Sequence, residues 1–471
     1  MTDTKAIRDR ILLLALKGEL AEQNPQDEPA SNLVDELCKS LGYKSFEPDF
    51  SVEDIPYDIP SSWAWCRLSD IGTTNIGLTY HPEDVKENGV IVARSGNIIN
   101  GKMDYSDLVK VSCDIRENQY LYNNDILICA RNGSKALVGK CAVYEGDSKK
   151  IAFGAFMAVF RTPLFRYVYR YFNTDVFKRN FTSDDSKQIN QVTQNILKQS
   201  LIPIPPLSEQ NRIVEKIDAI FEILDKIDAL QERYASNKEA LKSRLIEAAI
   251  QGKITEQIPE DGIAEELYQK IIEEKQRLTK EGKIKKSKEL AEIAEEEILF
   301  DIPNNWKWVR LSDVIDVRDG THDSPKYHDE GIPLVTSKNI SSGKLSFDDV
   351  KLISEVDANK INERSYVDDG DILFAMIGSI GNPVIVHKDR EFCIKNVALF
   401  KNFAPNCISM QYVYWFLMHE QYVLRKNAIG GLQPFVSLKV FRNHLMPLPP
   451  FDEQERISKR LYELMNIVSE R

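Results

Sequence analysis

The longest regular pattern of hydrophobic and polar positions in the chain lies between residues 208 and 251. Hydrophobic residues recur there at alternating spacings of four and three, with Gln231 and Lys238 as polar interruptions. A repeat of about 3.5 residues that continues over several heptads is typical of a coiled-coil helix. The pattern therefore predicts one long helix that presents a hydrophobic seam to a second helix.

Both ends of this helix carry suitable signals. Pro205 and Pro206 end an extended segment, because proline lacks a backbone donor and restricts the residue before it. Ser208 is a plausible N-cap, with Glu209 in the positive first turn. Gly252 predicts the end of the helix, as a glycine does just beyond many helix C-termini.

Two shorter segments at the chain ends have the same spacing. They align with the first and last thirds of the central helix, so we predict that they lie end to end beside it and complete a two-stranded bar. The predicted seam residues are Ile213, Ile217, Ile220, Leu224, Ile227, Leu241 and Leu245 in the central helix, Ile7, Ile11 and Leu14 near the N-terminus, and Ile457, Leu461, Leu464 and Val468 near the C-terminus.

The regions between these helices form an internal repeat, a feature that decides the fold before any local signal. The segment "LIPIPPLSEQNRI" (201–213) matches "LMPLPPFDEQERI" (445–457) at eight of thirteen positions. In the same order, "DIPSSWAWCRLSDI" (58–71) matches "DIPNNWKWVRLSDV" (301–314), and "DIL" occurs at 125–127 and 371–373. One domain of about 150 residues therefore occurs twice.

The helical material repeats with a different offset. "RILLLALKGELAEQNPQD" (10–27) resembles "RLIEAAIQGKITEQIPED" (244–261) at an offset of 234, whereas the proline-rich segments are 244 apart. Together these offsets exceed the length of 471 by only seven, so the two halves form a circularly permuted repeat cut inside one helix. The predicted segments are a helix (1–23), a connector (24–59), a first repeated domain (60–206), the central helix (207–252), a second connector (253–302), a second repeated domain (303–450) and a C-terminal helix (451–471).

Composition narrows the class of protein. Hydrophobic residues at 42% and charged residues at 28% describe a soluble globular protein, and no hydrophobic run approaches the length of a membrane span. Seven scattered cysteines without a CxxC pair disfavour disulfides and zinc sites, so we expect a cytoplasmic protein. The net charge of −11 hides a basic island at residues 126–170, with eight Lys or Arg against two acids.

The ordered motifs resemble those of the specificity subunits of type I restriction–modification systems. Two domains that open with "P..W.W.RL.D", contain "DIL" and end in "P.PP..EQ.RI" cover essentially the whole chain. The resemblance implies two α/β (α+β) target recognition domains in a pseudo-twofold arrangement, separated by long antiparallel coiled-coil helices. Each domain would read one half of a bipartite, asymmetric site in double-stranded DNA.

The resemblance also implies the partners. Two adenine-N6 methyltransferase subunits would bind the spacer and conserved regions and supply S-adenosylmethionine, and two motor-nuclease (restriction) subunits would join for restriction. This chain itself would bind no cofactor or metal, would not be an enzyme and would contact no membrane.

Polar side chains in the divergent loops are the candidate DNA contacts, since Arg and Lys read guanine, Asn and Gln read adenine, and Ser and Thr bind phosphates. In the first domain they are Arg94, Ser95, Asn97, Arg131, Asn132, Ser134, Lys135, Lys140, Lys187, Gln188, Asn190 and Gln191. In the second domain they are Thr321, His322, Thr336, Ser337, Lys338, Asn339, Ser379, Lys395, Asn396 and Gln433.

Three other classes of protein remain as alternatives. A stand-alone adenine methyltransferase needs a [D/N]-P-P-[Y/F/W] loop, but "LPPF" (448–451) begins with a leucine that has no acceptor side chain, and no GxGxxG motif follows a predicted strand. A pure scaffold would not need two divergent loop sets. The recognition subunit of a bifunctional restriction–methylation enzyme (type IIB-like) would share all of these features.

Overall fold

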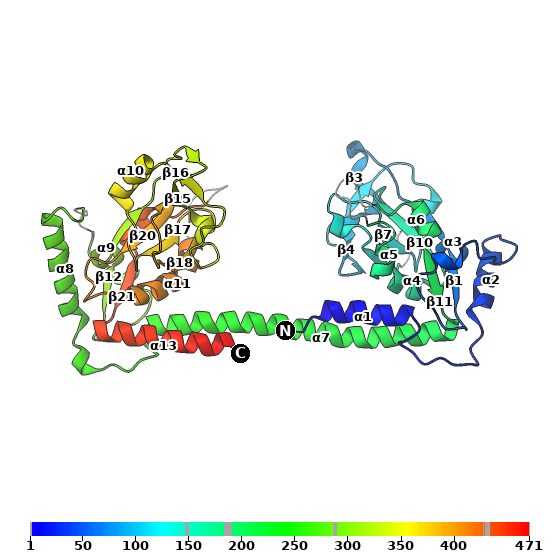
Figure 1. Ribbon diagram of the computed structural model, residues 1–471, viewed down its shortest axis with the longest axis horizontal. Coiled ribbons are helices and arrows are strands. Elements are labelled where there is room, and N and C mark those ends of the chain that lie inside the picture. Colours follow the sequence, from blue (N-terminus) through cyan, green and yellow to red (C-terminus); the bar gives the residue numbers. More distant parts are fainter. Residues whose placement is uncertain are drawn as a thin grey trace. The chain divides into compact units, whose positions relative to one another are not determined.

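The computed structural model describes residues 2–146, 150–182, 191–285, 290–426, 428 and 434–470. The chain forms two compact units, which we call unit 1 (Met1–Glu232) and unit 2 (Arg233–Arg471). The long helix α7 (Leu207–Ile250) contributes its first part to unit 1 and its last part to unit 2 (Figure 1).

The elements of the two units follow one another in a similar order. Those of unit 1 are α1 (Thr4–Leu16), α2 (Ala30–Ser40), β1 (Ala64–Arg67), α3 (Leu68–Ile71), β2 (Thr73–Ile76), β3 (Val85–Ala93), β4 (Ile98–Ile99), β5 (Lys102–Met103), β6 (Val109–Val111), β7 (Ile126–Cys129), β8 (Cys141–Val143), β9 (Ile151–Phe153), β10 (Met157–Arg161), α4 (Phe165–Phe172), α5 (Asp175–Lys178), α6 (Gln194–Gln199) and β11 (Leu201–Ile204). Those of unit 2 are α8 (Ala264–Lys280), β12 (Lys307–Arg310), α9 (Leu311–Val314), β13 (Asp316–Asp319), β14 (Tyr327–His328), β15 (Ile332–Val335), β16 (Lys351–Ile353), α10 (Glu355–Ser365), β17 (Ile372–Ala375), β18 (Gly381–Ile385), β19 (Cys393–Ile394), β20 (Val397–Lys401), α11 (Met410–Lys426), α12 (Leu438–Asn443), β21 (Leu445–Leu448) and α13 (Phe451–Glu470).

The central sheet repeats strand by strand in the two units, whereas the outer sheets differ in part. The central sheet has the order β2-β10-β7-β8 in unit 1 and β13-β20-β17-β18 in unit 2. A two-stranded sheet, β1-β11 or β12-β21, joins the first and last strands of each domain. A further sheet, with three strands in unit 1 (β6-β3-β9) and four in unit 2 (β14-β16-β15-β19), contains one parallel pair, β3-β9 or β15-β19. The mixed α/β fold and the internal repeat predicted from the sequence are thereby confirmed.

The central strands are buried on both faces, which is why they are continuous hydrophobic runs. Alternate side chains of a strand point to opposite faces of the sheet. In β7, Ile126 and Ile128 pack with α4 and α6 on one face, whereas Leu127 and Cys129 pack with β9 on the other. The central sheet of each domain is therefore held between two hydrophobic cores.

The repeated motifs meet where each domain enters its helix. In unit 1 the buried Glu209 carboxylate accepts hydrogen bonds from Trp63 Nε1 at 3.0 Å and from Gln23 Nε2 at 2.6 Å. Burial raises the pKa of Glu209, although both of these hydrogen bonds oppose the rise. Arg212, one turn further along, forms an ion pair with Asp27 at 2.6 Å.

Unit 2 repeats this arrangement with its own residues. Glu453 accepts from Trp306 Nε1 at 2.8 Å and from Gln257 Nε2 at 2.7 Å, and Arg456 Nη1 lies 3.0 Å from Asp261. We call the two arrangements the helix-entry clusters. They explain why "W", "EQ.P.D" and "EQ.RI" occur twice in the sequence, since these motifs are the parts of one structural contact.

A glycine completes each helix-entry cluster. Gly18 and Gly252 follow their helices with φ values of 74° and 69°, so the prediction that Gly252 ends the helix is confirmed. A Cβ atom at Gly18 would lie 2.5 Å from Pro60, and one at Gly252 would lie 2.6 Å from Pro303. The glycine thus permits both the left-handed backbone and the close approach of the proline-tryptophan segment.

The predicted N-cap of α7 is corrected. Helix α7 begins at Leu207 and α13 begins at Phe451, so Ser208 lies in the first turn and is not the N-cap. The glutamine of each "EQ.RI" motif bonds to the segment before the helix. Gln210 and Gln454 donate through Nε2 to the carbonyls of Pro205 and Pro449.

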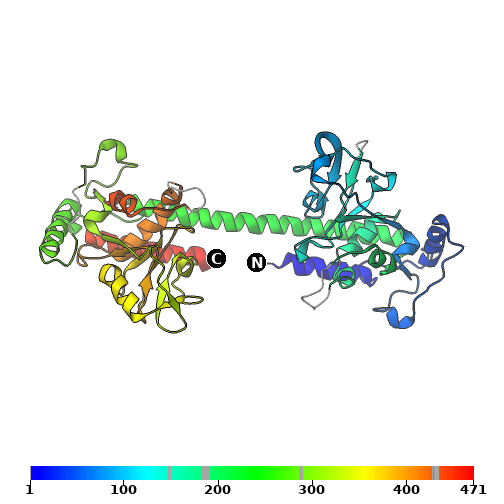
Figure 2. The same cartoon turned by 90° about the horizontal axis from the view of Figure 1, so that it is seen from above.

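Each terminal helix packs antiparallel on the part of α7 in its own unit (Figures 1 and 2). In unit 1, Arg8 bridges Asp225 and Asp228 of α7, both at 2.8 Å. In unit 2, Ile457 and Leu461 of α13 share a core with Ile246 and Ile250 of α7. Among the described residues, packing of both terminal helices on α7 is confirmed, and the end-to-end arrangement of the two stays a prediction.

The polar interruptions of the heptad pattern bind the tips of the terminal helices. Gln231 accepts a hydrogen bond from Thr2 N at 2.8 Å and donates to Thr2 O at 3.2 Å. Lys238, one heptad later, donates to the Ser469 carbonyl at 2.8 Å. These two side chains therefore satisfy backbone groups at helix ends that would otherwise need water.

The predicted seam is partly corrected. Ile7 and Leu241 are 38% and 47% exposed, respectively. The contact face of α1 contains Thr4, Arg8 and Leu12, one position along from the predicted residues, because the Arg8 ion pairs fix the rotation of the helix. Of the other predicted positions, Ile213, Ile217, Leu224, Ile457 and Leu461 are buried, and Ile11, Leu14, Ile220, Ile227, Leu245, Leu464 and Val468 are half-buried.

Candidate nucleic-acid interface

Five separate segments of unit 1 meet beyond the C-terminal end of β7. We call them loop cluster 1, which consists of residues 77–81, 94–97, 130–135, 154–156 and 191. Backbone hydrogen bonds connect them: Leu78 N donates to Phe153 O at 2.7 Å, Arg131 N to Phe156 O at 3.0 Å, and Val192 N to Ala130 O at 2.9 Å. The predicted contact segments are thus brought together in space.

Unit 2 builds the corresponding loop cluster 2 from residues 320–324, 335–339, 376–379, 394–396 and 434–436. Thr321 N donates to Ile394 O at 3.0 Å, Lys395 N to Val335 O at 2.9 Å, and Val436 N to Met376 O at 3.0 Å. The same backbone scheme therefore presents a different set of side chains in each unit.

A glycine allows the close approach of two loops in each cluster. A Cβ atom at Gly77 would lie 2.1 Å from the Gly154 carbonyl oxygen, and one at Gly320 would lie 2.3 Å from the Ile394 carbonyl oxygen. Real side chains do not reach such distances, so glycine is required at both positions.

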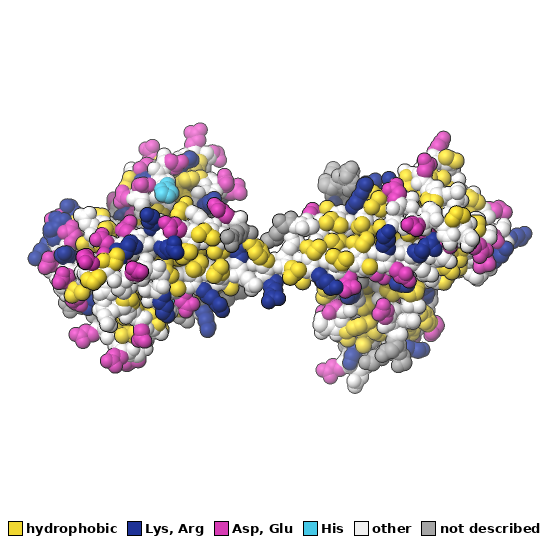
Figure 3. Space-filling view, turned by 90° about the horizontal axis from the view of Figure 1, so that it is seen from below, with side chains coloured by type: hydrophobic (Ala, Val, Ile, Leu, Met, Phe, Trp, Pro, Cys, Tyr) yellow, Lys and Arg dark blue, Asp and Glu magenta, His cyan; other side chains and the backbone are white. Residues whose placement is uncertain are grey.

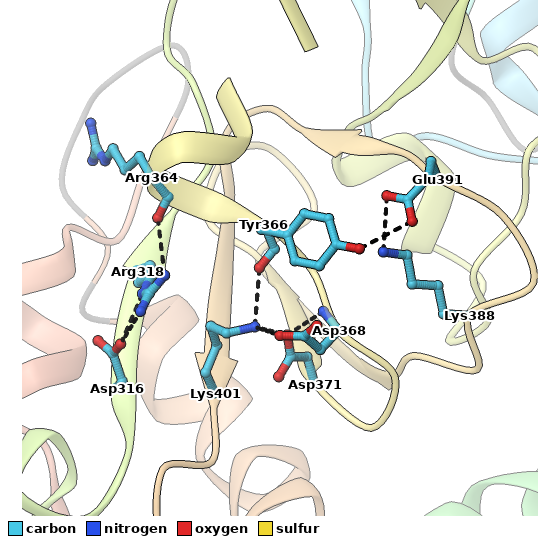
Figure 4. A network of polar contacts seen from close by, with 9 residues as sticks. All are labelled: Asp316, Arg318, Arg364, Tyr366, Asp368, Asp371, Lys388, Glu391 and Lys401. Atoms are coloured by element: carbon cyan, nitrogen blue, oxygen red, sulfur yellow. Dashed lines mark hydrogen bonds and ion pairs between the residues drawn. The ribbon is translucent and has the colours of Figure 1, made fainter. Parts of the chain in front are cut away.

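The opposite end of each sheet is braced by the aspartate of the "DIL" motif. Asp371 precedes β17 and receives Lys401 Nζ of β20, which also bonds Asp368 and the Tyr366 carbonyl (Figure 4). In unit 1 the Asp125 carboxylate receives Arg161 Nε, with both oxygens at 3.0 Å. Burial raises the pKa of Asp125 and of Asp371 despite these partners.

Most of the predicted contact residues are exposed or half-buried, and all of these except Lys140 lie in the two clusters. Arg131, Ser134, Lys135, Gln191, His322, Lys338 and Ser379 are exposed, and Arg94, Ser95, Asn132, Lys140, Thr321, Thr336, Ser337, Lys395 and Asn396 are half-buried. Lys187, Gln188, Asn190 and Gln433 lie outside the described residues. The accessible groups include the donors and acceptors that bind base edges and phosphates.

Two predicted contacts are corrected. Asn97 and Asn339 are only 1% and 7% exposed. Asn97 accepts from Arg94 N at 2.9 Å and donates to the carbonyls of Asp104 and Asp107. Asn339 accepts from Thr336 N and donates to the Asp348 carbonyl. Their amides shape equivalent turns and are not available to a ligand.

The basic island is also corrected. Arg166 and Arg170 both pair with Asp218 of α7, and Arg161 pairs with Asp125, so these three charges are neutralised within the unit. Arg131 and Lys135 are exposed, and no ion pair of either is found within the described part of the chain. Loop cluster 1 therefore keeps two positive charges available to a ligand, whereas the exposed Lys150 of the same island lies outside it.

Sequence patterns missed one side chain in loop cluster 1 and one beside loop cluster 2. Arg364, at the end of α10, pairs with the buried Asp319, which also receives His322 Nε2 at 2.9 Å. Phe156 lies in loop cluster 1 and is 63% exposed. No local signal marks Arg364, whereas the position of Phe156 between two hydrophobic strands disguises it as a core residue.

Two negative findings limit the chemistry of the described residues. Within the described ranges, no group of three or more His, Cys, Asp or Glu side chains could hold a metal ion. In the same part of the chain, no helix is long and apolar enough to cross a membrane.

Two copies of one frame, each with its own polar loops, define a two-headed recognition protein. The family model described as the type I restriction modification DNA specificity domain matches residues 60–233 and 303–470, so the chain belongs to this family. It is the specificity subunit of a type I restriction–modification system, as the resemblance predicted.

Curated relatives match along nearly their whole length. The chain is 26% identical to the type I restriction enzyme EcoAI specificity subunit of Escherichia coli, with 98% of this chain and 89% of that protein covered. It is 24% identical to the EcoKI specificity subunit of Escherichia coli strain K12, with 86% and 82% covered.

A solved structure described as "Structural basis underlying complex assembly and conformational transition of the type I R-M system" contains a chain with the same fold. Its TM-score to this protein is 0.60 at 18% identity, with 88% of this chain and 93% of that chain covered.

Proposed function

We propose that the protein reads a bipartite, asymmetric site in double-stranded DNA, with loop cluster 1 on one half and loop cluster 2 on the other. The main support is the contrast between a repeated frame and different side chains at equivalent loop positions. Leu78 and Gly154 form a backbone bridge in unit 1, and Thr321 and Lys395 form the same bridge in unit 2. Gly154 therefore corresponds to Lys395, and Leu78 to Thr321. Two different reading surfaces predict two different half-words.

We propose a non-catalytic role for the chain itself. The only proline pairs that approach a methyltransferase loop stand at the entries of α7 and α13, where the carbonyls of Pro205 and Pro449 accept glutamine amides. Adenine-N6 methylation, S-adenosylmethionine binding and base flipping would therefore belong to two partner methyltransferase subunits.

The helices offer a surface for these partners. Figure 3 shows hydrophobic side chains gathered along the part of unit 1 that contains α1 and α7. The exposed hydrophobic residues of these helices in unit 1 include Ile7, Ile223 and Leu230, at 38%, 57% and 63% exposed. Exposed hydrophobic patches commonly mark protein interfaces, so we assign this one to a methyltransferase subunit.

Introducing negative charges on this hydrophobic surface tests whether it binds the methyltransferase subunit. In the double variant Ile223→Asp/Leu230→Asp, we expect copurification of the methyltransferase subunit to fall roughly tenfold or more, because carboxylates would have to lose water at the contact. Val52→Asp, at an 85% exposed connector residue of the same unit, is the control. Equal recovery of the methyltransferase with both proteins would show that it binds elsewhere.

The function is tested by mapping methylated adenines in cells that express the chain with its cognate methyltransferase subunit, or that subunit alone. We expect a bipartite motif with an unread gap only when both proteins are present. A continuous motif, or the same motif without this chain, would reject the proposal.

Motor-nuclease partners are tested separately by restriction of unmodified phage DNA after addition of the restriction subunit.

A further inference from the structure

Loop cluster 1 contains one residue more than loop cluster 2 at the connection between its last two equivalent strands. In unit 2, Lys395 and Asn396 connect β19 to β20. In unit 1, Gly154, Ala155 and Phe156 connect β9 to β10. The backbone contacts on both sides are equivalent, so the additional residue is Phe156.

The backbone around Phe156 is firmly held. Its carbonyl accepts hydrogen bonds from Ala130 N at 2.9 Å and Arg131 N at 3.0 Å. On its two sides, Ala155 N donates to Leu78 O and Met157 N donates to Gly154 O, both at 2.8 Å. A tip with this many backbone bonds presents its side chain in one place, which lowers the entropy cost of binding.

The side chain nevertheless remains in water. Phe156 is 63% exposed, although burial of a phenylalanine ordinarily contributes about 1.5–3 kcal/mol. The guanidinium of Arg131 lies over its ring, 5.9 Å from the centroid, within the range of a cation–π contact. The exposed Lys135 belongs to the same cluster. An exposed aromatic ring on a firmly held backbone thus lies beside a cation, among the candidate DNA contacts.

We propose that Phe156 inserts at a base-pair step of the half-site read by loop cluster 1, with Arg131 contacting the adjacent bases or phosphate. This inference rests on the proposed function and specifies how one half-site is read. Apolar wedges unstack a step and kink the duplex, and steps of pyrimidine followed by purine unstack most easily. Loop cluster 2 has no residue at this position of its connection, and its own exposed phenylalanine, Phe435, lies on a different segment, so we expect this insertion in one half of the site only.

The test uses the complete complex of this chain with its methyltransferase subunits and a duplex that contains the mapped motif. 2-Aminopurine replaces, one at a time, purines of both half-words other than the methylated adenines. Its fluorescence rises when stacking is lost. We expect a rise at one position in the first half-word and none in the second, and Phe156→Ala should abolish it.

Affinity gives a second readout. Phe156→Ala should weaken DNA binding roughly tenfold to a hundredfold, as loss of one base–aromatic stack does, and Phe156→Trp should retain both the binding and the fluorescence signal. Tyr43→Ala is the matched control, since Tyr43 is a 54% exposed aromatic residue of the same unit outside the cluster.

Three results would overturn the inference. They are equal fluorescence with Phe156→Ala and the unchanged protein, unchanged affinity of that variant, or loss of methyltransferase subunits from its complex, which would make Phe156 a protein contact. Failure of the proposed function would be distinct, because the unchanged complex would then methylate no bipartite motif.

Discussion

Replacement of Glu453 by alanine is expected to lower the free energy of unfolding of unit 2 by about 3 kcal/mol. The change leaves Trp306 Nε1 and Gln257 Nε2 without their acceptor, and Trp306 is only 6% exposed. A buried donor that loses its partner costs about 1–3 kcal/mol, because water cannot replace the lost bond. Glu209→Ala should have a similar effect in unit 1, where Trp63 and Gln23 lose their acceptor.

Urea denaturation with hydrogen exchange measures the loss and locates it. Glu455→Ala is the matched control, since Glu455 is exposed on the same helix two residues away. A double-mutant cycle with Trp306→Phe should give a coupling energy of about 1–3 kcal/mol, as expected for residues in direct contact. If Glu453→Ala were no less stable than Glu455→Ala, the helix-entry cluster would have no part in stability.

Glu420 is expected to make the stability of unit 2 depend on pH. Its carboxylate is 4% exposed and accepts from His419 Nδ1 at 2.6 Å and from His444 Nε2 at 2.9 Å. Burial alone would raise the pKa of Glu420, but the two histidine hydrogen bonds outweigh it and lower the pKa to about 2. A shift from 4.5 to about 2 corresponds to roughly 3 kcal/mol.

The direction of the pH dependence follows from the lowered pKa of Glu420. An acid whose pKa is lower in the folded protein stabilises it fully above the unfolded pKa of 4.5, and this contribution is lost as pH falls toward 2. We therefore expect Glu420→Gln to be less stable than the unchanged protein at pH 7, with a difference that shrinks between pH 5 and 3. Urea midpoints of both proteins across this range, with Glu455→Gln as control, provide the measurement. A difference independent of pH would contradict the prediction.

The repeat could be predicted from the sequence because the helix-entry clusters demand particular residues. Glu209 needs both an indole donor and an amide donor, and Gly18 tolerates no Cβ atom beside Pro60. These requirements hold equally in unit 2, so the same residues recur at the same spacing. What the sequence did not reveal is that its separate motifs form one contact.

The rotation of α1 could not be predicted from the sequence. Heptad spacing identified the helices and placed the buried Ile457 and Leu461 of α13 correctly, but the exposed Ile7 shows that hydrophobicity alone misplaced the contact face of α1 by about one position. The ion pairs of Arg8 with Asp225 and Asp228 decide the rotation of α1, and they join residues more than two hundred positions apart. No local pattern contains that information.

The structure brings the predicted loop segments together, whereas the sequence could not tell which single side chains are accessible. A polar residue in a divergent loop can face a ligand, as Arg131 can, or hold a turn, as Asn97 does. Only the hydrogen-bond partners distinguish the two cases. Phe156 was missed for the opposite reason, because a phenylalanine between two strands is usually a core residue.

The central claim is that each loop cluster reads its own half-word, and half-specific changes in the methylated motif test it most directly. Methylated adenines should be mapped for Arg131→Ala and for Lys338→Ala, at an exposed residue of loop cluster 2, each expressed with the methyltransferase subunit. We predict that Arg131→Ala relaxes one half-word and Lys338→Ala the other, with the remaining half-word and the gap unchanged in each case. A variant that relaxed both half-words, or two variants that relaxed the same one, would contradict the account.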